Sequence, residues 1–120
     1  MKGLSPRTII QRFVEHVNQG NIEGVNSLVS PDIVFTDIAG RVYREQEFME
    51  NYMREFPNYK IHVDHLLQGG DGVAIVGHTT GSHVPADIEE KEVLVWTAEV
   101  TDGLISEWRI YSGEEYAGRS

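Results

Sequence analysis

The 120-residue sequence contains no cysteine. Disulfide bonds and thiol chemistry are therefore excluded, although the absence of cysteine by itself names no compartment. No apolar run reaches the roughly 18 residues that a membrane span needs. The opening segment MKGLSPRT also lacks the apolar stretch of a secretory signal. We therefore expect a cytoplasmic protein that does not insert into a membrane.

Positive charge is scarce and scattered. The sequence contains ten Lys and Arg residues and 19 Asp and Glu residues, which gives a formal net charge of −9. An acidic surface repels a phosphate backbone, so we do not expect nucleic-acid binding. The sequence also lacks a Gly-rich phosphate loop, a nucleophile elbow and a Cys/His cluster. No cofactor is predicted.

The residues that are present suffice for one folded core. Apolar residues make up 40% of the chain, with five Tyr, four Phe and two Trp. A chain of this length is expected to form one domain. We predict a single domain over residues 1–120, with the polar segment 113–120 as a loose tail.

The first half of the chain is predicted to be mainly helical. Ser5-Pro6 is a typical helix start, and apolar residues then recur at helical spacing until Gly20. A shorter helix is predicted from Asn21 through Val29, because the residue before Pro31 disfavours helical geometry. A strand within residues 30–40 and a helix from about 45 to 56 are predicted to follow.

The second half alternates between apolar and polar residues, as strands do. We predict strands at 59–68, 73–83, 89–101 and 104–112, with turns at 69–72 and 101–103 and a loop at 84–87. The fold class is α+β: a strongly curved antiparallel sheet wrapped over helices as a cone with an internal pocket, an α+β roll.

Asp37 is the main candidate for chemistry. On a strand it shares one face with Ile33 and Phe35, so a carboxylate continues an apolar row. Such a group at a pocket mouth is suited to act as a general base. The alternative is a solvated strand-end Asp whose side chain bonds to Ala39 or Gly40 in an Asx-type turn.

Histidines supply two further candidates. His78 is expected to pair with Asp37 or to donate to a substrate oxygen, unless it is a structural histidine. His62 and Asp64 share a face and suggest a metal site. His65 is predicted to face the other side, and a third ligand has no evident source. No metal site is therefore predicted.

A set of aromatic residues lies on the apolar rows of the predicted helices and strands. Such residues are ordinarily core, but at the mouth of a cone they also line ligand pockets. They are suited to bind a hydrophobic ring system. The candidate pocket residues are Phe13, Tyr52, Phe56, Trp96 and Trp108.

Several segments, in this order, resemble the nuclear-transport-factor-2-like superfamily, which includes the SnoaL-like polyketide cyclases and the ketosteroid isomerases. They are IIQRFVEHVNQGN, SLVSPDIVFTDIAG, the helix from Phe48 to Phe56, GGDGVAIVGHTTG and VTDGLISEWRIYSG. The resemblance covers almost the whole chain. It implies the curved-sheet fold, a pocket and a homodimer. The scaffold hosts enzymes, binding modules and oligomerisation domains, so the fold alone does not define an activity.

The site residues of that superfamily match only in part. Asp37 and Gly40 fall on the general-base motif of the ketosteroid isomerases. The positions of their two oxyanion donors hold Phe13 and Trp96, and losing one such donor costs on the order of 3–4 kcal/mol of transition-state stabilisation. The acidic residue of the cyclases is replaced by Ser112.

Two functional hypotheses follow. The first is an isomerase, cyclase or hydratase that uses Asp37 on a hydrophobic carbonyl compound, with His78 or the Trp96 indole polarising the carbonyl. The second is a non-catalytic ligand-binding or dimerisation domain. In either case, an uncovered sheet face carrying Val93, Val95, Arg109 and Tyr111 suggests a homodimer.

Overall fold

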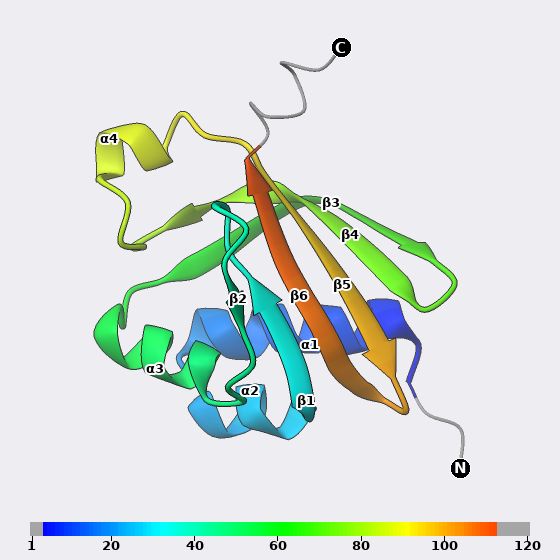
Figure 1. Cartoon of the computed structure of the whole chain (residues 1–120). Helices are drawn as coiled ribbons and strands as arrows, with labels where there is room; N and C mark the ends of the chain where they lie inside the picture. Colours follow the sequence, from blue (N-terminus) through cyan, green and yellow to red (C-terminus); the bar gives the residue numbers. More distant parts are fainter. Residues whose placement is uncertain (1–3, 113–120) are drawn as a thin grey trace.

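The computed structural model describes residues 4–112, and it is a mixed α+β domain built on one sheet (Figure 1). The mixed class confirms the prediction from sequence. The elements in chain order are α1 (Pro6–Gln19), α2 (Ile22–Leu28), β1 (Val29–Thr36), β2 (Val42–Tyr43), α3 (Phe48–Glu55), β3 (Lys60–Gly69), β4 (Gly72–Thr80), α4 (Ala86–Glu89), β5 (Leu94–Thr101) and β6 (Leu104–Ser112).

Helix α1 begins and ends at the residues that its sequence indicates. The Ser5 hydroxyl accepts a hydrogen bond from the Thr8 amide at 3.2 Å, and Pro6 occupies the first helical turn. Gly20 ends the helix in the left-handed region, with φ of 69°. The buried face of α1 consists of Ile9, Ile10, Phe13, Val14 and Val17.

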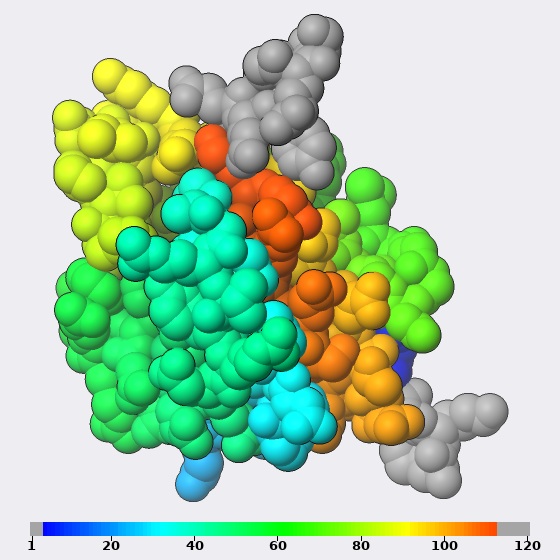
Figure 2. All heavy atoms as spheres, viewed as in Figure 1, coloured from blue at the N-terminus to red at the C-terminus, as the bar shows by residue number. Residues whose placement is uncertain are grey.

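The sheet has six strands in the order β2-β1-β6-β5-β4-β3. Every pairing is antiparallel except β1 with β6, which is parallel and joins segments far apart in the chain. The sheet is curled but not closed, and α1 lies behind the strands in Figure 1. In the space-filling view of this side, β5 and β6 reach the surface with no helix over them (Figure 2).

A β-bulge in β3 changes which way one histidine faces. The pairing shifts register between Val63 opposite Gly77 and His65 opposite Val76, which leaves Asp64 as the extra residue. One inserted residue reverses the alternation of faces beyond it. His65 therefore lies on the same outer face as His62, and the prediction from strict alternation that they face opposite sides was wrong.

The segment between β4 and β5 differs most from the prediction. The strand predicted at 73–83 ends at Thr80, where Gly81 adopts a φ of 72°. The strand predicted at 89–101 begins only at Leu94, and the short helix α4 precedes it. Glu89 explains the change: it is only 5% exposed, and its carboxylate accepts hydrogen bonds from Thr79 in β4 and from Ser82 in the loop instead of facing solvent.

Other boundaries shift by a few residues. The third helix begins at Phe48 rather than near residue 45, and the short strand β2 adds an edge to the sheet. No helix within residues 4–112 is long and apolar enough to cross a membrane. The tail predicted to be loose, 113–120, lies outside the described residues.

Candidate functional site

A small cavity of about 110 Å³ lies between the sheet and helix α3. It adjoins a larger outer depression of about 570 Å³. Five residues line both, so the two spaces form one site with an inner and an outer part. These shared residues are Asp37, Phe48, Tyr52, His83 and Ile110. We call the two parts the inner cavity and the outer depression.

The inner cavity is mostly aromatic because bulky residues on β1, β5 and β6 point into the curl of the sheet. Trp96 is fully buried and Trp108 is 4% exposed, with their ring centroids 6.5 Å apart. Phe35 and Phe48 close another wall with centroids 4.9 Å apart. Such walls favour a hydrophobic ring as the occupant.

Asp37 follows β1 directly and its carboxylate is held by its own turn. Oδ1 accepts a hydrogen bond from the Arg41 amide at 2.9 Å. Oδ2 accepts one from the Tyr43 hydroxyl at 3.2 Å. The turn is closed by the Gly40 amide, which donates to the Asp37 carbonyl at 2.9 Å. Each carboxylate oxygen keeps a second lone pair, so the group is oriented but still able to accept a proton.

Tyr52 and His83 form a second polar pair in the same site. The Tyr52 hydroxyl lies 2.8 Å from Nδ1 of His83 and accepts a hydrogen bond from the His83 amide at 3.1 Å. Their rings meet edge to face with centroids 5.8 Å apart. The site therefore combines the Asp37 carboxylate, which follows β1, with the His83 imidazole, which comes from the loop after β4.

Burial keeps the tyrosine hydroxyls of the site protonated. It raises the pKa of Tyr52, against the hydrogen bond from the His83 amide, which by itself would lower that pKa. Tyr59 is 8% exposed, and burial, then the nearby Tyr52, raises its pKa further. Both hydroxyl groups are therefore neutral at any physiological pH.

The structure brings some of the predicted site residues together and separates others. Asp37, Tyr52, Trp96 and Trp108 all line the inner cavity. Phe56 lines the outer depression but not the inner cavity.

Two predicted residues lie away from the site. Phe13 is fully buried in the core, 4.8 Å from Trp108 between ring centroids. His78 lines neither part and is not paired with Asp37. Its side chain is on the outer face of β4, because residues 73, 75, 77 and 79 are the buried ones.

On that outer face His78 stacks on His62, with ring centroids 4.7 Å apart and planes 16° from parallel. Nε2 of His62 lies 2.9 Å from the Thr80 hydroxyl. Stacked rings direct their nitrogen lone pairs in parallel rather than toward one point, which is unsuited to chelation. No group of three metal-binding side chains exists within residues 4–112.

Sequence reasoning missed several residues of the site, among them Tyr43, Tyr59 and His83. Tyr43 lines the outer depression because β2 places it opposite Phe35. Tyr59 lies just before β3, where its apolar row already indicated burial. His83 lies at the end of the strand predicted at 73–83, and nothing in the sequence indicates that a loop returns it to the cavity.

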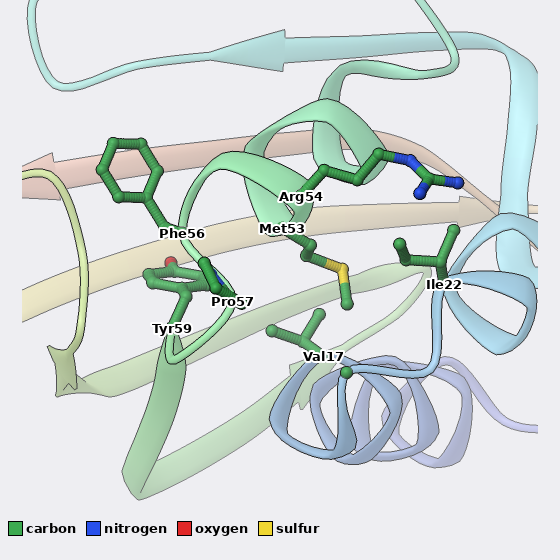
Figure 3. Close-up of a pocket in the computed structure, with 8 residues that line it drawn as sticks. Val17, Ile22, Met53, Arg54, Phe56, Pro57 and Tyr59 are labelled. Atoms are coloured by element: carbon green, nitrogen blue, oxygen red, sulfur yellow. The ribbon is translucent and has the colours of Figure 1, made fainter.

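A second cavity of about 380 Å³ lies between the end of α1, the start of α2 and helix α3 (Figure 3). Met53 extends toward Val17 in this view, and Arg54 lies at the rim. Tyr59 lines this cavity as well as the inner cavity. Arg54 also forms an ion pair with Glu50 at 2.9 Å, so the rim carries little net charge.

Solved structures share this architecture. An NTF2-like protein from Cytophaga hutchinsonii aligns with a TM-score of 0.78 at 15% identity, over 98% of this chain and 99% of that one. A candidate ketosteroid isomerase from Kribbella flavida aligns at 0.74 and 20% identity, over 89% and 76%. An LEH-like epoxide hydrolase from M. tuberculosis aligns at 0.72 and 13% identity, over 92% and 84%.

These likenesses show a fold of the NTF2-like class. A comparison with curated proteins finds no significant match. The model of the SnoaL-like domain matches residues 10–108. The chain therefore belongs to the SnoaL-like family, within the NTF2-like superfamily, and the resemblance seen in the sequence is confirmed.

Proposed function

We propose that this protein is an enzyme of isomerase, cyclase or hydratase type in which Asp37 acts as the general base on a small hydrophobic carbonyl compound. The observation that carries the proposal is the position of the Asp37 carboxylate at the edge of an aromatic cavity. The turn orients both oxygens without using all their lone pairs. A positioned base of this kind contributes roughly 10²–10⁴-fold to a proton transfer.

The dimensions of the site support a small substrate. The inner cavity, about 110 Å³, is below the roughly 300–1,000 Å³ of most ligand sites, whereas the outer depression lies within that range. One ring is expected to enter between Trp96 and Phe48, while the rest of the molecule occupies the outer depression. The carbonyl then lies at the junction, where Asp37 is found.

Proton exchange tests the proposal without knowledge of the natural substrate. The protein is incubated with 2-indanone in D₂O, and loss of the proton signal next to the carbonyl is followed by NMR. We expect exchange about 100-fold faster with the wild type than with Asp37→Asn. Asp32→Asn is the matched control, because Asp32 is an exposed carboxylate on β1, the strand that Asp37 follows. Equal rates for wild type and Asp37→Asn contradict the proposal.

A non-catalytic ligand-binding domain is the second candidate. It is supported by the fact that both Asp37 oxygens already accept hydrogen bonds from the 37–43 segment, as a purely structural Asp would. Binding of 2-indanone, measured by calorimetry, without accelerated exchange favours this candidate.

We also propose that two copies pair through the outer face of the sheet. Glu99 lies directly opposite Glu107 on β5 and β6, an unfavourable like-charge pair. On the same face, the Arg109 guanidinium lies over the Tyr111 ring, 4.7 Å from its centroid, and its Nε makes no hydrogen bond to any described residue. A two-fold arrangement that brings the Arg109 guanidinium of one copy to the acidic pair of the other offsets the like-charge repulsion.

A further inference from the structure

We infer that His83 donates a hydrogen bond from Nε2 to the carbonyl oxygen of the ligand, and that Tyr52 is the positioning residue that directs the imidazole proton to Nε2. The inference rests on the proposed function, because it assumes a carbonyl ligand beside Asp37. It assigns to the loop after β4 the role that sequence reasoning had given to His78 on the strand.

The hydrogen bonds around Tyr52 determine the tautomer. The Tyr52 oxygen accepts a hydrogen bond from the His83 amide at 3.1 Å. The Ser82 hydroxyl also hydrogen-bonds the Tyr52 oxygen, and we assign it as a donor there because Ser82 Oγ already accepts from the Val84 amide at 3.2 Å. Both lone pairs of the Tyr52 oxygen are then occupied, so its own proton is directed to Nδ1 of His83, at 2.8 Å. A neutral imidazole that accepts at Nδ1 carries its proton on Nε2. Nε2 makes no hydrogen bond to any described residue, so its N–H is free to donate to a ligand.

The surroundings hold this imidazole at the junction of the two parts of the site. His83 lines the inner cavity and the outer depression, as Asp37 does. Its ring packs against Tyr52 and lies 6.0 Å from Phe56 between centroids. The preceding residue, Ser82, is anchored because its amide donates to the buried Glu89 carboxylate at 3.1 Å. The loop is therefore fixed on the N-terminal side of the ring.

Asp37 and His83 have different roles in one reaction: Asp37 transfers the proton, and His83 stabilises the oxygen. Asp37 accepts the proton from the carbon next to the carbonyl, so that the C–H bond breaks and its electron pair forms a carbon–carbon double bond. The electrons of the carbonyl π bond move to the oxygen, which becomes an enolate. The Nε2 proton of His83 stabilises this oxygen by a hydrogen bond. Protonated Asp37 later returns the proton to carbon, and no oxidant or reductant is needed.

The direct test is the carbonyl stretching frequency of bound 2-indanone, labelled with ¹³C at the carbonyl and measured by infrared difference spectroscopy. We expect a shift to lower frequency in the wild type, because a hydrogen bond weakens the C=O bond. His83→Phe is expected to abolish the shift, and His83→Gln to restore part of it through its amide donor. His62→Phe, on the outer face, is the control and is expected to leave the shift unchanged.

Proton exchange and NMR of the ring nitrogens complete the test. His83→Phe is expected to slow exchange about 100-fold, as loss of an oxyanion donor does. In the ligand-free protein, the ring nitrogens of His83 are expected to show a proton on Nε2, and Tyr52→Phe to give a mixture of tautomers. If Nδ1 of His83 carries the proton in the wild type, the assignment of Tyr52 as the positioning residue is overturned.

The outcomes separate this inference from the proposed function. If exchange is not accelerated but the carbonyl shift depends on His83, the inference holds and Asp37 is not the base. If the carbonyl shift is the same in wild type and His83→Phe, the inference is overturned even where Asp37→Asn abolishes exchange. Failure of 2-indanone to bind also overturns it.

Discussion

The Tyr43 hydroxyl donates a hydrogen bond to Oδ2 of Asp37 at 3.2 Å, across the turn that joins β1 to β2. Tyr43 is held in place by pairing with Phe35 and by stacking on Phe48, with ring centroids 4.6 Å apart. A residue of a two-residue edge strand thus orients the carboxylate that we propose as the base. The turn is part of the site as well as of the fold.

Removing the Tyr43 hydroxyl tests how much the orientation of the Asp37 carboxylate contributes to the exchange rate. Tyr43→Phe keeps the ring stack but loses the donor to Asp37, so we expect ketone exchange to slow about tenfold. The free energy of unfolding is expected to fall by about 1 kcal/mol, the usual value of one hydrogen bond. NMR exchange and urea unfolding measure the two effects. Exchange at the wild-type rate would show that Tyr43 does not orient the base.

The bulge in β3 predicts a severe effect at Gly77. A Cβ at this position collides with the His62 carbonyl oxygen and lies 3.3 Å from the Val63 Cα, and neither is the end of a flexible side chain. Gly77→Ala is therefore expected to cost about 3 kcal/mol of unfolding free energy.

Gly72→Ala is the matched control on the same strand. Its Cβ meets only the Gly69 oxygen at 3.5 Å and the Ala98 oxygen at 3.8 Å, which are ordinary contacts. We expect a change within about 1 kcal/mol. Urea denaturation distinguishes the two variants, and equal stabilities would mean that the β3–β4 pairing differs from the one described.

Glu89 makes the stability of the loop after β4 dependent on pH. Burial by itself raises the pKa of this carboxyl group, but hydrogen bonds from Ser82, Thr79 and neighbouring amides outweigh it and hold the pKa below its ordinary 4.5. A lowered folded-state pKa means that the stabilisation is complete above pH 4.5 and is lost as the pH falls through the folded-state value.

Two substitutions measure this contribution. Glu89→Ala leaves the Thr79 hydroxyl and the Ser82 amide without their acceptor, so we expect a loss of about 2 kcal/mol at pH 7. Glu89→Gln keeps an acceptor and is expected to flatten the decline in stability between pH 5 and pH 3. Urea unfolding across this range checks both, with the exposed Glu90→Gln as control. An unchanged pH profile in Glu89→Gln contradicts the assignment.

The proposed pairing of two copies predicts a charge-dependent equilibrium. Arg109→Glu adds a third carboxylate beside Glu99 and Glu107, so we expect the dimer fraction in sedimentation velocity to fall at least tenfold. Arg12→Glu makes the same charge change on an exposed position of α1 and is expected to leave the fraction unchanged. A monomeric wild type at high micromolar concentration rules out the pairing.

Much of the fold was predictable from sequence because its signals are local. The α1 face repeats at helical spacing between a Ser-Pro start and Gly20, so one helix was the only consistent interpretation. The alternation through β4, β5 and β6 placed Trp96 and Trp108 on buried rows, as the structure has them. Asp37 was selected in the same way, because a carboxylate ends an apolar row, and its role as a base stays a prediction.

Tertiary structure alone decided the remaining features, since they depend on contacts between distant segments. The parallel pairing of β1 with β6 has no local signal. The bulge that brings His65 to the outer face depends on pairing with β4. The imidazole of the site is His83, not His78, because buried Glu89 folds its loop back until His83 reaches Tyr52, 31 residues away in sequence. Sequence pattern determined which residues are apolar and where turns begin, whereas long-range hydrogen bonds and strand register determined which polar groups meet at the cavity.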